Sequence, residues 1–530
     1  MSQGVVETEL KFEVPPGKVG APLPPLRGIG AGQGRVVGVG PARRMTQTAT
    51  YYDTPDLALL AAKHTLRRRT GGADAGWHLK TPGGGESVAG APARREFHEP
   101  LGPARSGPPV ALRERVADIV GREVLLPVAV LRTVRIRREL LDADGRVLAL
   151  VEDDSVQAWR PEAADSAESA SIVAWREVEV ELVDGDGGDL AAIAAAFESA
   201  GFTLSRAPSK LNQALEGLGL TPGANAAVPA DVLADPTGER LAVWRYLAAQ
   251  VGVLQALEAQ VVRDEPDAVH KTRVATRRLR ATLRTIRPWL DTAQSQAMRL
   301  QVRWLTRVLA PARDGEVVRE RLLAALDELP RADVRGPIRR RMTRSLDAAH
   351  AQAHARGAAA MESPRFARLI GGLLDLLLDL PWNTSPEDAQ SIQRLLEGSR
   401  RRVRKRALRA DDAADAAERE FQLHEVRKKA KAARYAVEAS QQDGILAQSS
   451  GMTKGEAAAA ADLDSWVDLQ ELLGDHQDAV VAREVLRRLA REARAAGEDT
   501  YTYGVLVGRE TQRIADGDAR MEGALEEALS

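Results

Sequence analysis

Polar and apolar residues alternate with a period of two through most of the first part of the chain. The alternation is clearest in VVETELKFEV near the N-terminus and returns at 65–70, 77–81, 130–138, 146–156 and 173–183. Clusters of glycine and proline separate these segments. Because successive residues of a strand point to opposite faces of a sheet, the pattern predicts a β domain built from several strands.

The pattern changes to helical spacing after about Asp231, in stretches rich in Ala, Leu, Arg and Glu. Between the two halves lies LTPGANAAVPADVLADPTG, whose composition is typical of a linker. We therefore predict a domain over 1–218, a linker over 219–237 and a helical domain over 238–525. The predicted fold class is α+β with two domains, which agrees with the length of 530 residues.

Composition restricts the chemistry that the chain can carry. It has no cysteine, which excludes disulfides and thiolate metal sites, and its 8 histidines form no zinc-binding spacing. A metal would therefore be held by carboxylates, which favours Mg²⁺ or Mn²⁺. The N-terminus lacks the features of a signal peptide and no apolar run is long enough to span a membrane, so we expect a cytoplasmic protein without a membrane partner.

Charged residues also recur at a spacing of two in the predicted strands, so that each set shares one face. The sets are Glu7, Glu9 and Lys11; Arg67 and Arg69; Glu152 and Asp154; and Glu177, Glu179 and Glu181. One such strand is ordinarily the solvated side of an antiparallel sheet. Several of them, with both signs of charge, favour a closed barrel whose interior is charged.

A charged lumen of this kind suits a phosphate polymer and a metal ion together. Lysines and arginines bind phosphoryl oxygens, whereas carboxylates hold divalent cations that bridge to phosphate and activate water. Both kinds of side chain facing one cavity make metal-assisted hydrolysis of a phosphoanhydride a concrete hypothesis.

An ordered series of motifs then identifies the relatives of this domain. It comprises Glu7-Thr8-Glu9-Leu10-Lys11, Tyr51-Tyr52-Asp53-Thr54-Pro55, Leu66-Arg67-Arg68-Arg69, Trp77-His78-Leu79-Lys80, Arg94-x-Glu96, Arg132-x-x-Arg135, Glu152-Asp153-Asp154, Glu177-x-Glu179-x-Glu181 and Ser209-Lys210. The series resembles the CYTH domain, also called the triphosphate tunnel metalloenzyme family, over residues 3–218. The resemblance implies an antiparallel tunnel of eight strands.

The same resemblance implies roles for individual residues. Triphosphate would be bound by Lys11, Arg67, Arg69, Lys80, Arg94, Arg132, Arg135 and Lys210. Mg²⁺ or Mn²⁺ would be held by Glu7, Glu9, Glu152, Asp154, Glu179 and Glu181. Catalysis would rest on Glu7, Glu9, Lys11 and Lys210. Leu150 departs from the family pattern, since it shares a strand face with Glu152 and Asp154 where we expect an acid.

The second half contains a repeated basic motif. His270 and His424 are each followed by a base three, seven and ten residues later, which places a stripe on one side of a helix. An Asp follows each motif after an apolar helix end, at Asp314 and Asp478, so we predict an internal duplication. Such a stripe is often only a solvated helix face, but its clustering favours a polyanion groove.

Nucleic acid is a weaker alternative as the partner of this groove. Aromatic residues are 4 % of the chain, which leaves few rings to stack on bases. The paired histidines lack a second ligand at helical spacing, apart from the adjacent Glu425, so we expect hydrogen bonds to phosphate from them rather than metal coordination.

The duplicated motif resembles the CHAD domain, a conserved histidine α-helical domain, over about 235–525. The resemblance implies two four-helix bundles and binding of inorganic polyphosphate. The binding residues would be His270, Arg273, Arg277, Arg280, His424, Arg427, Lys428, Lys431 and Arg434. It also makes polyphosphate granules a place where the protein would associate.

Together these expectations give a metal-dependent hydrolase of inorganic triphosphate or short polyphosphate, with a helical domain that binds polyphosphate. Two alternatives stay open at this point. A protein that binds phosphate polymers without turnover would have the same two domains. Nucleotide cyclisation or chemistry on an RNA 5′-triphosphate would use the same tunnel, although the CHAD-like partner disfavours it.

Overall fold

The fold is described from a computed structural model of the whole chain. It describes residues 5–14, 20–30, 35–72, 74–83, 93–102, 107–161, 171–223, 225–383, 391–412, 414–415, 418, 421–422, 425–426 and 454–529. The chain divides into a first unit, Met1–Pro229, and a second unit, Ala230–Ser530. This division falls within the segment that the sequence analysis assigned to a linker.

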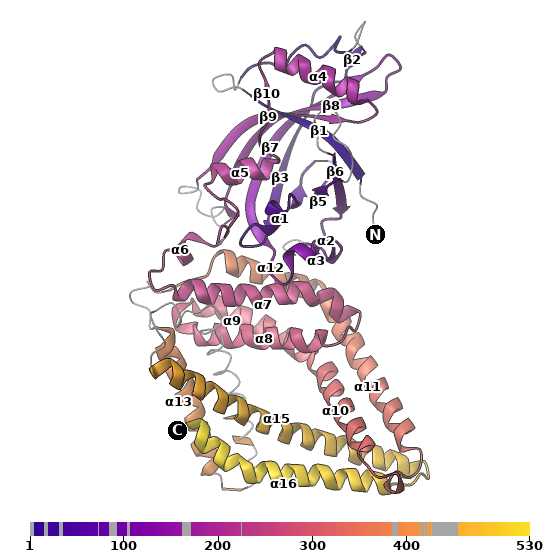
Figure 1. The fold of residues 1–530 in the computed structure, drawn as a ribbon, viewed down its shortest axis with the longest axis vertical. Helices are drawn as coiled ribbons and strands as arrows, with labels where there is room; N and C mark the ends of the chain where they lie inside the picture. The colour runs from indigo at the N-terminus through magenta and orange to yellow at the C-terminus, as the bar shows by residue number, and fades with distance from the viewer. Residues whose placement is uncertain are drawn as a thin grey trace. The chain divides into compact units, whose positions relative to one another are not determined.

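Ten antiparallel strands form the first unit (Figure 1). They are β1 (Val5–Glu13), β2 (Gly38–Val39), β3 (Arg43–Asp53), β4 (Thr65–Thr70), β5 (Gly76–Pro82), β6 (Ala93–Glu99), β7 (Leu126–Leu141), β8 (Val147–Trp159), β9 (Val173–Leu182) and β10 (Thr203–Leu204). Eight of them pair in the order β1-β6-β5-β4-β3-β7-β8-β9, and β9 pairs again with β1. The sheet therefore closes into the predicted eight-stranded barrel, which β2 and β10 extend at its edges.

The barrel closes because the first strand serves two partners along its length. Residues Val5–Thr8 of β1 pair with β6, whereas Glu9–Glu13 pair with β9. Within this register Glu9 lies opposite Glu181, and Lys11 lies opposite Glu179. The alternation read from the sequence thus becomes an inside and an outside of one closed sheet.

The outer face of β1, β8 and β9 is apolar and is covered by α4 (Gly187–Ser199). Phe12 of β1 stacks on Phe197 of α4, with ring centroids 4.9 Å apart, and Val180 is also fully buried there. Asp186 and Asp189 form a capping box that fixes the start of this helix. The lumen can be charged because this outer layer supplies the apolar core.

Short helices complete the first unit. They are α1 (Ala58–Ala61), α2 (Val110–Arg115), α3 (Ala117–Val120) and α5 (Lys210–Gly217). Ser209 caps the N-terminus of α5, and the next residue, Lys210, is the first of the helix. The following segment folds back on the same unit, since the amide of Ala227 donates to the carbonyl of Pro55 at 2.9 Å.

The second unit is helical. Its helices are α6 (Ala230–Leu233), α7 (Glu239–Val262), α8 (Ala268–Thr285), α9 (Thr292–Val308), α10 (Ala310–Asp327), α11 (Ile338–Met361), α12 (Pro364–Leu378), α13 (Ile392–Asp411), α15 (Lys454–Ala495) and α16 (Tyr501–Leu529), with single 3₁₀ turns at Arg287–Trp289 and Arg331–Asp333. None of the helices in the described ranges is long and apolar enough to cross a membrane.

Two groups of four helices carry the packing of the second unit. One group is α7, α8, α9 and α12, which pack against one another. The other is α10, α11, α15 and α16, which share an apolar core that includes Leu322, Met342, Leu486 and Tyr503. The second group combines α10 and α11 from the first half of the helical unit with α15 and α16 from its second half. The helical fold was predicted correctly, but the sequence analysis did not predict that the two halves share one bundle.

Candidate functional site

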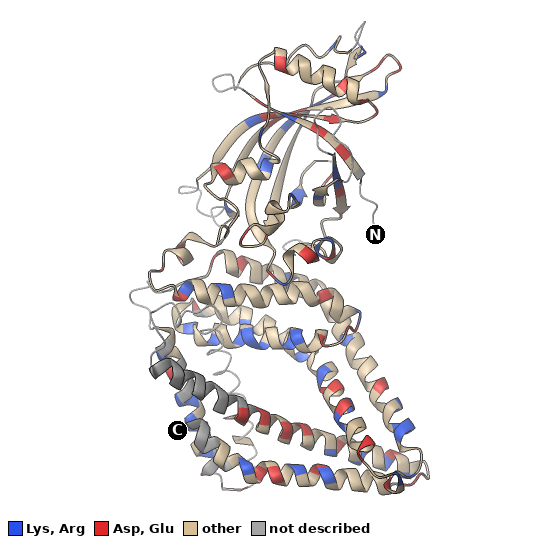
Figure 2. Ribbon diagram, in the orientation of Figure 1, with Lys and Arg blue, Asp and Glu red and all other residues tan. Residues whose placement is uncertain are grey.

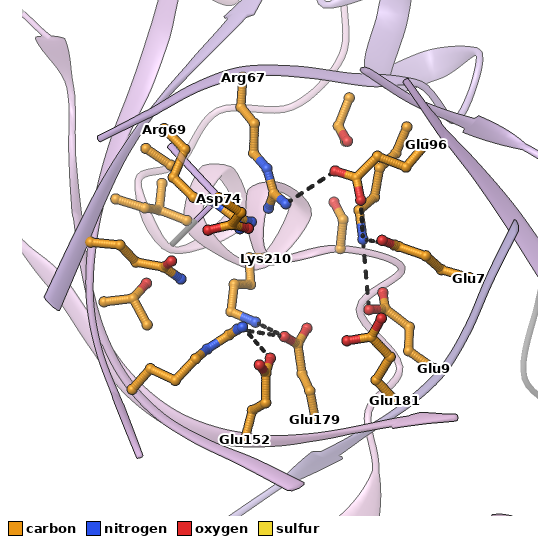
Figure 3. Close-up of a pocket in the computed structure, with 18 of the residues that line it drawn as sticks. Glu7, Glu9, Arg67, Arg69, Asp74, Glu96, Glu152, Glu179, Glu181 and Lys210 are labelled. Carbon is orange, nitrogen blue, oxygen red and sulfur yellow. Dashed lines mark hydrogen bonds and ion pairs between the residues drawn. The ribbon is translucent and has the colours of Figure 1, made fainter. Parts of the chain in front are cut away.

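The lumen of the barrel gathers charged side chains from nearly every strand (Figure 3). Its basic residues are Lys11, Arg67, Arg69, Lys80, Arg94, Arg135, Arg137 and Lys210. Its acidic residues are Glu7, Glu9, Asp74, Glu96, Glu152, Glu179 and Glu181. The cavity measures about 250 Å³. Its walls are a mixture of cations and carboxylates with little apolar surface.

One end of the charged network is organised around Lys210. Its ammonium lies 3.1 Å from Asp154, 2.6 Å from Glu177 and 2.5 Å from Glu179. Asp154 and these two glutamates are close enough together to form a candidate metal cluster. The ammonium already lies within contact distance of all three, so this trio fits a lysine better than a divalent cation.

Arg135 ties the same carboxylates to the neighbouring strands. Its guanidinium donates to Asp154 at 2.8 and 2.6 Å and to Glu179 at 2.9 Å, and it also contacts Glu152. Arg137 donates to the other oxygen of Glu152 at 2.7 Å. Burial opposes the charged form, but these carboxylates hold the pKa of Arg135 well above its usual range.

A second acidic group has fewer cations around it. Glu9 and Glu181 lie opposite each other on β1 and β9, with their side chains in the lumen (Figure 3). Burial and the charges of Glu152 and Glu9 raise the pKa of Glu181. Burial also opposes ionisation of Glu9, yet Lys80 and Lys11 lower the pKa of that carboxyl to about 2. Glu181 has no ion-pair partner in the described residues, so this part of the lumen keeps one carboxylate that no base contacts.

Glu7 and Glu96 form a third contact on the β5–β6 side of the lumen. The ammonium of Lys80 lies 2.5 Å from Glu7, and Nδ1 of His78 lies 2.8 Å from Glu96. Burial and a hydrogen bond to Glu96 raise the pKa of Glu7 to about 8. Arg67 also reaches Glu96, at 3.5 Å, so a single carboxylate orients three basic side chains here.

Most residues that the sequence assigned to the site do lie in the lumen. The described lumen contains Glu7, Glu9, Lys11, Arg67, Arg69, Lys80, Arg94, Arg135, Glu152, Glu179, Glu181 and Lys210, and Asp154 is fully buried against Arg135 and Lys210. Leu150 also lines the cavity, opposite Glu181 on β9. The position where an acid was expected is thus apolar inside the tunnel itself.

Arg132, which the sequence analysis assigned to the triphosphate, is not among the residues that line the lumen. This side chain is exposed, whereas its neighbours Leu131, Thr133 and Arg135 line the lumen. Successive residues of a strand point to opposite faces of the sheet. Arg132 is an odd number of positions from Arg135, so its side chain lies on the outer wall of the barrel. The same alternation would have identified Arg137, which the sequence analysis missed.

Other lumen residues also went unassigned. Tyr51 accepts a hydrogen bond from Arg67 at 3.3 Å, and Glu96 was noted only as part of a motif. Asp74 comes from the β4–β5 hairpin, where no strand periodicity signals its direction.

The predicted basic stripe of the second unit lies on α8. Arg273 is mostly buried, and it donates to Asp314 at 3.0 Å and to the carbonyl of Ala310 at 2.5 Å. The Asp that follows the motif in sequence therefore fixes the base at the third position after His270. Burial and the charge of Arg313 lower the pKa of His270, which favours a neutral imidazole.

Arginines of α8 and α9 lie close together without acidic partners. They are Arg280 and Arg284 of α8 and Arg299, Arg303 and Arg307 of α9, and we call them the arginine cluster. Burial and the charges of Arg303, Arg299 and Arg307 lower the pKa of Arg280. None of the five has an ion-pair partner in the part of the chain that the structure describes, and Figure 2 shows the basic residues along α8. The α9 members were not predicted.

The second copy of the repeated motif falls mostly outside the described residues. The predicted ligands His424, Arg427, Lys428, Lys431 and Arg434 lie outside the described residues. Asp478, which corresponds to Asp314, is on α15.

Comparison with known proteins agrees with both halves of this description. Residues 6–210 match the CYTH domain and residues 245–487 match the CHAD domain. An uncharacterized protein of Mycobacterium tuberculosis is 34 % identical over 535 residues, covering 99 % of this chain and 96 % of that protein.

Two further similarities cover only parts of the chain. Thiamine-triphosphatase of Homo sapiens is 40 % identical over 85 residues, which are 16 % of this chain and 30 % of that enzyme. The crystal structure of the CHAD domain from the plant Ricinus communis has a TM-score of 0.40 and 25 % identity, and it covers 54 % of this chain and 91 % of that one.

Proposed function

The chain belongs to the bacterial proteins in which a CYTH domain is followed by a CHAD domain, and from this premise we propose that its tunnel hydrolyses inorganic triphosphate or a short polyphosphate. The observation that carries the proposal is the lumen itself, where eight basic side chains and seven carboxylates face one cavity. Family membership supports a triphosphatase-type hydrolase, and the lumen chemistry supports a short phosphate chain as its substrate.

Binding of the triphosphate would rest first on the bases whose ion pairs within the protein are absent or long. Arg94 donates to the carbonyl of Pro208, and no carboxylate in the described residues pairs with it. Arg67 has one long ion pair in the described residues, with Glu96 at 3.5 Å, and a hydrogen bond to Tyr51 at 3.3 Å. These guanidiniums can therefore turn to phosphoryl oxygens at low cost. The remaining bases proposed as triphosphate ligands are Lys11, Arg69, Lys80, Arg135 and Lys210.

The metal would be held by carboxylates on the Glu9 and Glu181 side of the lumen. Glu181 has no ion-pair partner in the described residues, and Glu9 lies opposite it with the ammonium groups of Lys11 and Lys80 3.6 and 3.8 Å away. Glu7 would exchange its contact with Lys80 for the metal. Glu152, Asp154 and Glu179 are bound by Arg135 or Lys210, so we propose that they position these bases beside the metal. A bound Mg²⁺ or Mn²⁺ would supply an activated water and charge neutralisation.

The protein's own residues would do the rest of the chemistry. Lys11 and Lys80 lie 3.6 and 3.8 Å from Glu9, a proposed metal ligand, so they can contact oxygens of the phosphate under attack and stabilise its developing charge. Arg67 and Arg94 would hold the rest of the phosphate chain in line. The closed barrel limits access of bulk water to the reacting bond.

The first test is phosphate release from inorganic triphosphate by the purified protein. We expect release with Mg²⁺ or Mn²⁺, none with EDTA, and slower release from ATP. Glu7→Gln with Glu9→Gln should lower kcat at least about 100-fold, since two proposed metal ligands are lost. The matched control, Glu198→Gln with Glu216→Gln, alters exposed acids of α4 and α5. Full activity in the lumen variant would refute the metal assignment.

A second candidate substrate is an organic triphosphate. It is favoured by the similarity to thiamine-triphosphatase over 85 residues. Comparing kcat/KM for thiamine triphosphate and for inorganic triphosphate would decide between them, and a higher value for the thiamine ester would overturn inorganic triphosphate as the preferred substrate.

For the second unit we propose binding of inorganic polyphosphate by α8 and the arginine cluster. Five arginines for which the described residues supply no carboxylate partner would attract a flexible polyanion, which would neutralise them together. Arg277 and Arg280 stay among the proposed ligands, whereas the contacts of Arg273 with Asp314 and Ala310 indicate that it positions α8 on α10. Such binding would also bring the protein to polyphosphate granules.

A further inference from the structure

The hairpin between β4 and β5 places a carboxylate on one of the tunnel's arginines. Asp74 forms an ion pair with Arg69, and both side chains line the lumen (Figure 3). The two partners differ in burial, because the side chain of Asp74 is 47 % exposed and that of Arg69 is 7 % exposed. The carboxylate therefore lies between solvent and the buried guanidinium.

Arg69 needs an anion in this position. It shares a strand face with Arg67, and burial together with the charge of Arg67 lowers the pKa of Arg69. Arg67 has Tyr51 and Glu96 as partners, whereas Arg69 has only Asp74 as an ion-pair partner within the described residues. Without Asp74, the free tunnel would contain a buried arginine beside a like charge.

The hairpin backbone is built to hold Asp74 there. Gly71 and Gly72 adopt φ of +78° and +80°, a region that favours glycine. At Gly76 there is no room for a side chain, since a Cβ would lie 2.1 Å from Nε2 of His98. Nε2 of His78 lies 2.9 Å from the carbonyl oxygen of Asp74. The backbone is thus anchored, while the carboxylate itself can rotate away into solvent.

We propose that Asp74 is a built-in competitor for phosphate: it neutralises Arg69 in the free tunnel and is displaced whenever a phosphoryl group binds there. A carboxylate and a phosphoryl group offer a guanidinium the same paired oxygen acceptors, so the two exclude each other. The inference rests on the proposed binding of triphosphate in the tunnel. Its consequence is weaker binding of every phosphate that uses Arg69, and faster release of the product that remains there.

The test compares Asp74→Asn with the wild-type full-length chain. Calorimetric titration of inorganic triphosphate in EDTA measures the Kd without turnover, and steady-state kinetics with Mg²⁺ measure KM and inhibition by pyrophosphate. We expect Asp74→Asn to lower the Kd and KM about three- to tenfold and to strengthen inhibition by pyrophosphate to a similar degree. Asp74→Ser should shift these values in the same direction, which guards against an effect particular to the amide.

Two controls make the outcome specific. Asp118→Asn removes the same charge from the exposed surface of α3 and should leave the Kd unchanged. In an Arg69→Gln background, Asp74→Asn should have no further effect, because the two residues act through one contact. A persisting effect in that background would overturn the proposed displacement.

The results also separate this inference from the proposed function. If the wild-type protein hydrolyses triphosphate and Asp74→Asn leaves both Kd and KM unchanged, only the role of Asp74 is refuted. If the wild-type protein neither binds nor hydrolyses triphosphate, the proposed function fails. In that case, binding of triphosphate gained by Asp74→Asn would support the inference on Asp74. If this variant does not bind triphosphate either, the inference and the proposed function are both overturned.

Discussion

The tunnel of the first unit and the arginine cluster of the second unit both collect bases for a phosphate chain, but they treat the charge differently. In the tunnel, Arg135 and Lys210 each contact three carboxylates. In the cluster, Arg280 and its neighbours on α9 have no carboxylate partner in the described residues, and burial together with the charges of those neighbours lowers the pKa of Arg280. One site has its counterions built in, whereas the described part of the helical unit supplies none for the other.

This difference follows from burial. An arginine or lysine inside a closed barrel is desolvated, and it is stable there only with carboxylates close by. Those carboxylates also fix its direction, which suits a site that must align a short phosphate chain with a metal. The bases on α8 and α9 stay partly in water, so repulsion among them costs less and a mobile polyanion can screen it. The tunnel is built for orientation and the cluster for capture.

The largest expected effect concerns stability of the tunnel. Lys210→Met would leave Glu177 without an ion-pair partner in the described residues, while Asp154 would keep Arg135 and Glu179 would keep Arg135 and Lys11. We expect the free energy of unfolding of the barrel to fall by about 3–5 kcal/mol, the cost of removing one partner from a buried ion-pair network. Hydrogen exchange of β7–β9 as a function of urea, resolved by mass spectrometry, measures this in the full chain.

Arg94→Met is the matched control for this variant. It removes one positive charge from the same lumen, but within the described residues Arg94 pairs only with the carbonyl of Pro208. Its cost should be about 1 kcal/mol, the net value of one hydrogen bond. Equal losses in the two variants would mean that the carboxylates around Lys210 do not depend on it, and that the contrast between the two regions is drawn wrongly.

The next effect concerns capture of polyphosphate by the cluster. Arg280→Glu with Arg303→Glu should weaken binding of a long-chain polyphosphate about 100-fold, because two charge-assisted contacts of about 1.5 kcal/mol each are lost. Fluorescence anisotropy of end-labelled polyphosphate measures the Kd. Release of phosphate from inorganic triphosphate should stay unchanged, since neither residue belongs to the tunnel.

Arg487→Glu with Arg491→Glu changes the charge equally on exposed positions of α15 and serves as the control. Its Kd for polyphosphate should change less than about threefold, by screening of distant surface charges. If both double variants lose affinity to the same degree, binding depends on net charge and not on the cluster.

A smaller effect should separate the two regions by their response to salt. Raising NaCl from about 50 to about 200 mM should weaken polyphosphate binding about tenfold or more, because several exposed contacts compete with dissolved ions. The KM for inorganic triphosphate should rise less than about threefold, since the lumen bases are buried and already paired. Parallel salt dependence would contradict the division between orientation and capture.

Much of this architecture could be predicted from the sequence, because the alternation of side chains along a strand is a strict geometrical rule. Glu7, Glu9 and Lys11 share a face for the same reason that Glu177, Glu179 and Glu181 do; all of them line the lumen except Glu177, which contacts the lumen base Lys210. The closed barrel followed from repetition of that pattern, and the helical second unit followed from the change of period. The pairing of Arg273 with Asp314 also gives a physical reason for the spacing of the repeated motif.

Three features could not be read from the sequence, each for its own reason. Asp74 lies in a hairpin, where side-chain direction depends on φ and ψ of a few glycines rather than on a period. The α9 arginines became significant only when packing brought them beside α8. Which carboxylates are neutralised by bases, and which are left for a metal, depends on distances between strands far apart in sequence.

The last prediction uses Arg132, the one base among the predicted triphosphate ligands that alternation places outside the barrel. Arg132→Gln should change the Kd for inorganic triphosphate less than about twofold, because its exposed side chain lies on the outer wall. Arg135→Gln, three positions along the same strand, removes contacts with Asp154, Glu152 and Glu179 and should weaken binding at least about tenfold. Calorimetric titration in EDTA measures both. A loss at Arg132 equal to that at Arg135 would mean that the phosphate chain reaches the outer wall, and it would remove the reason for assigning the substrate to the lumen.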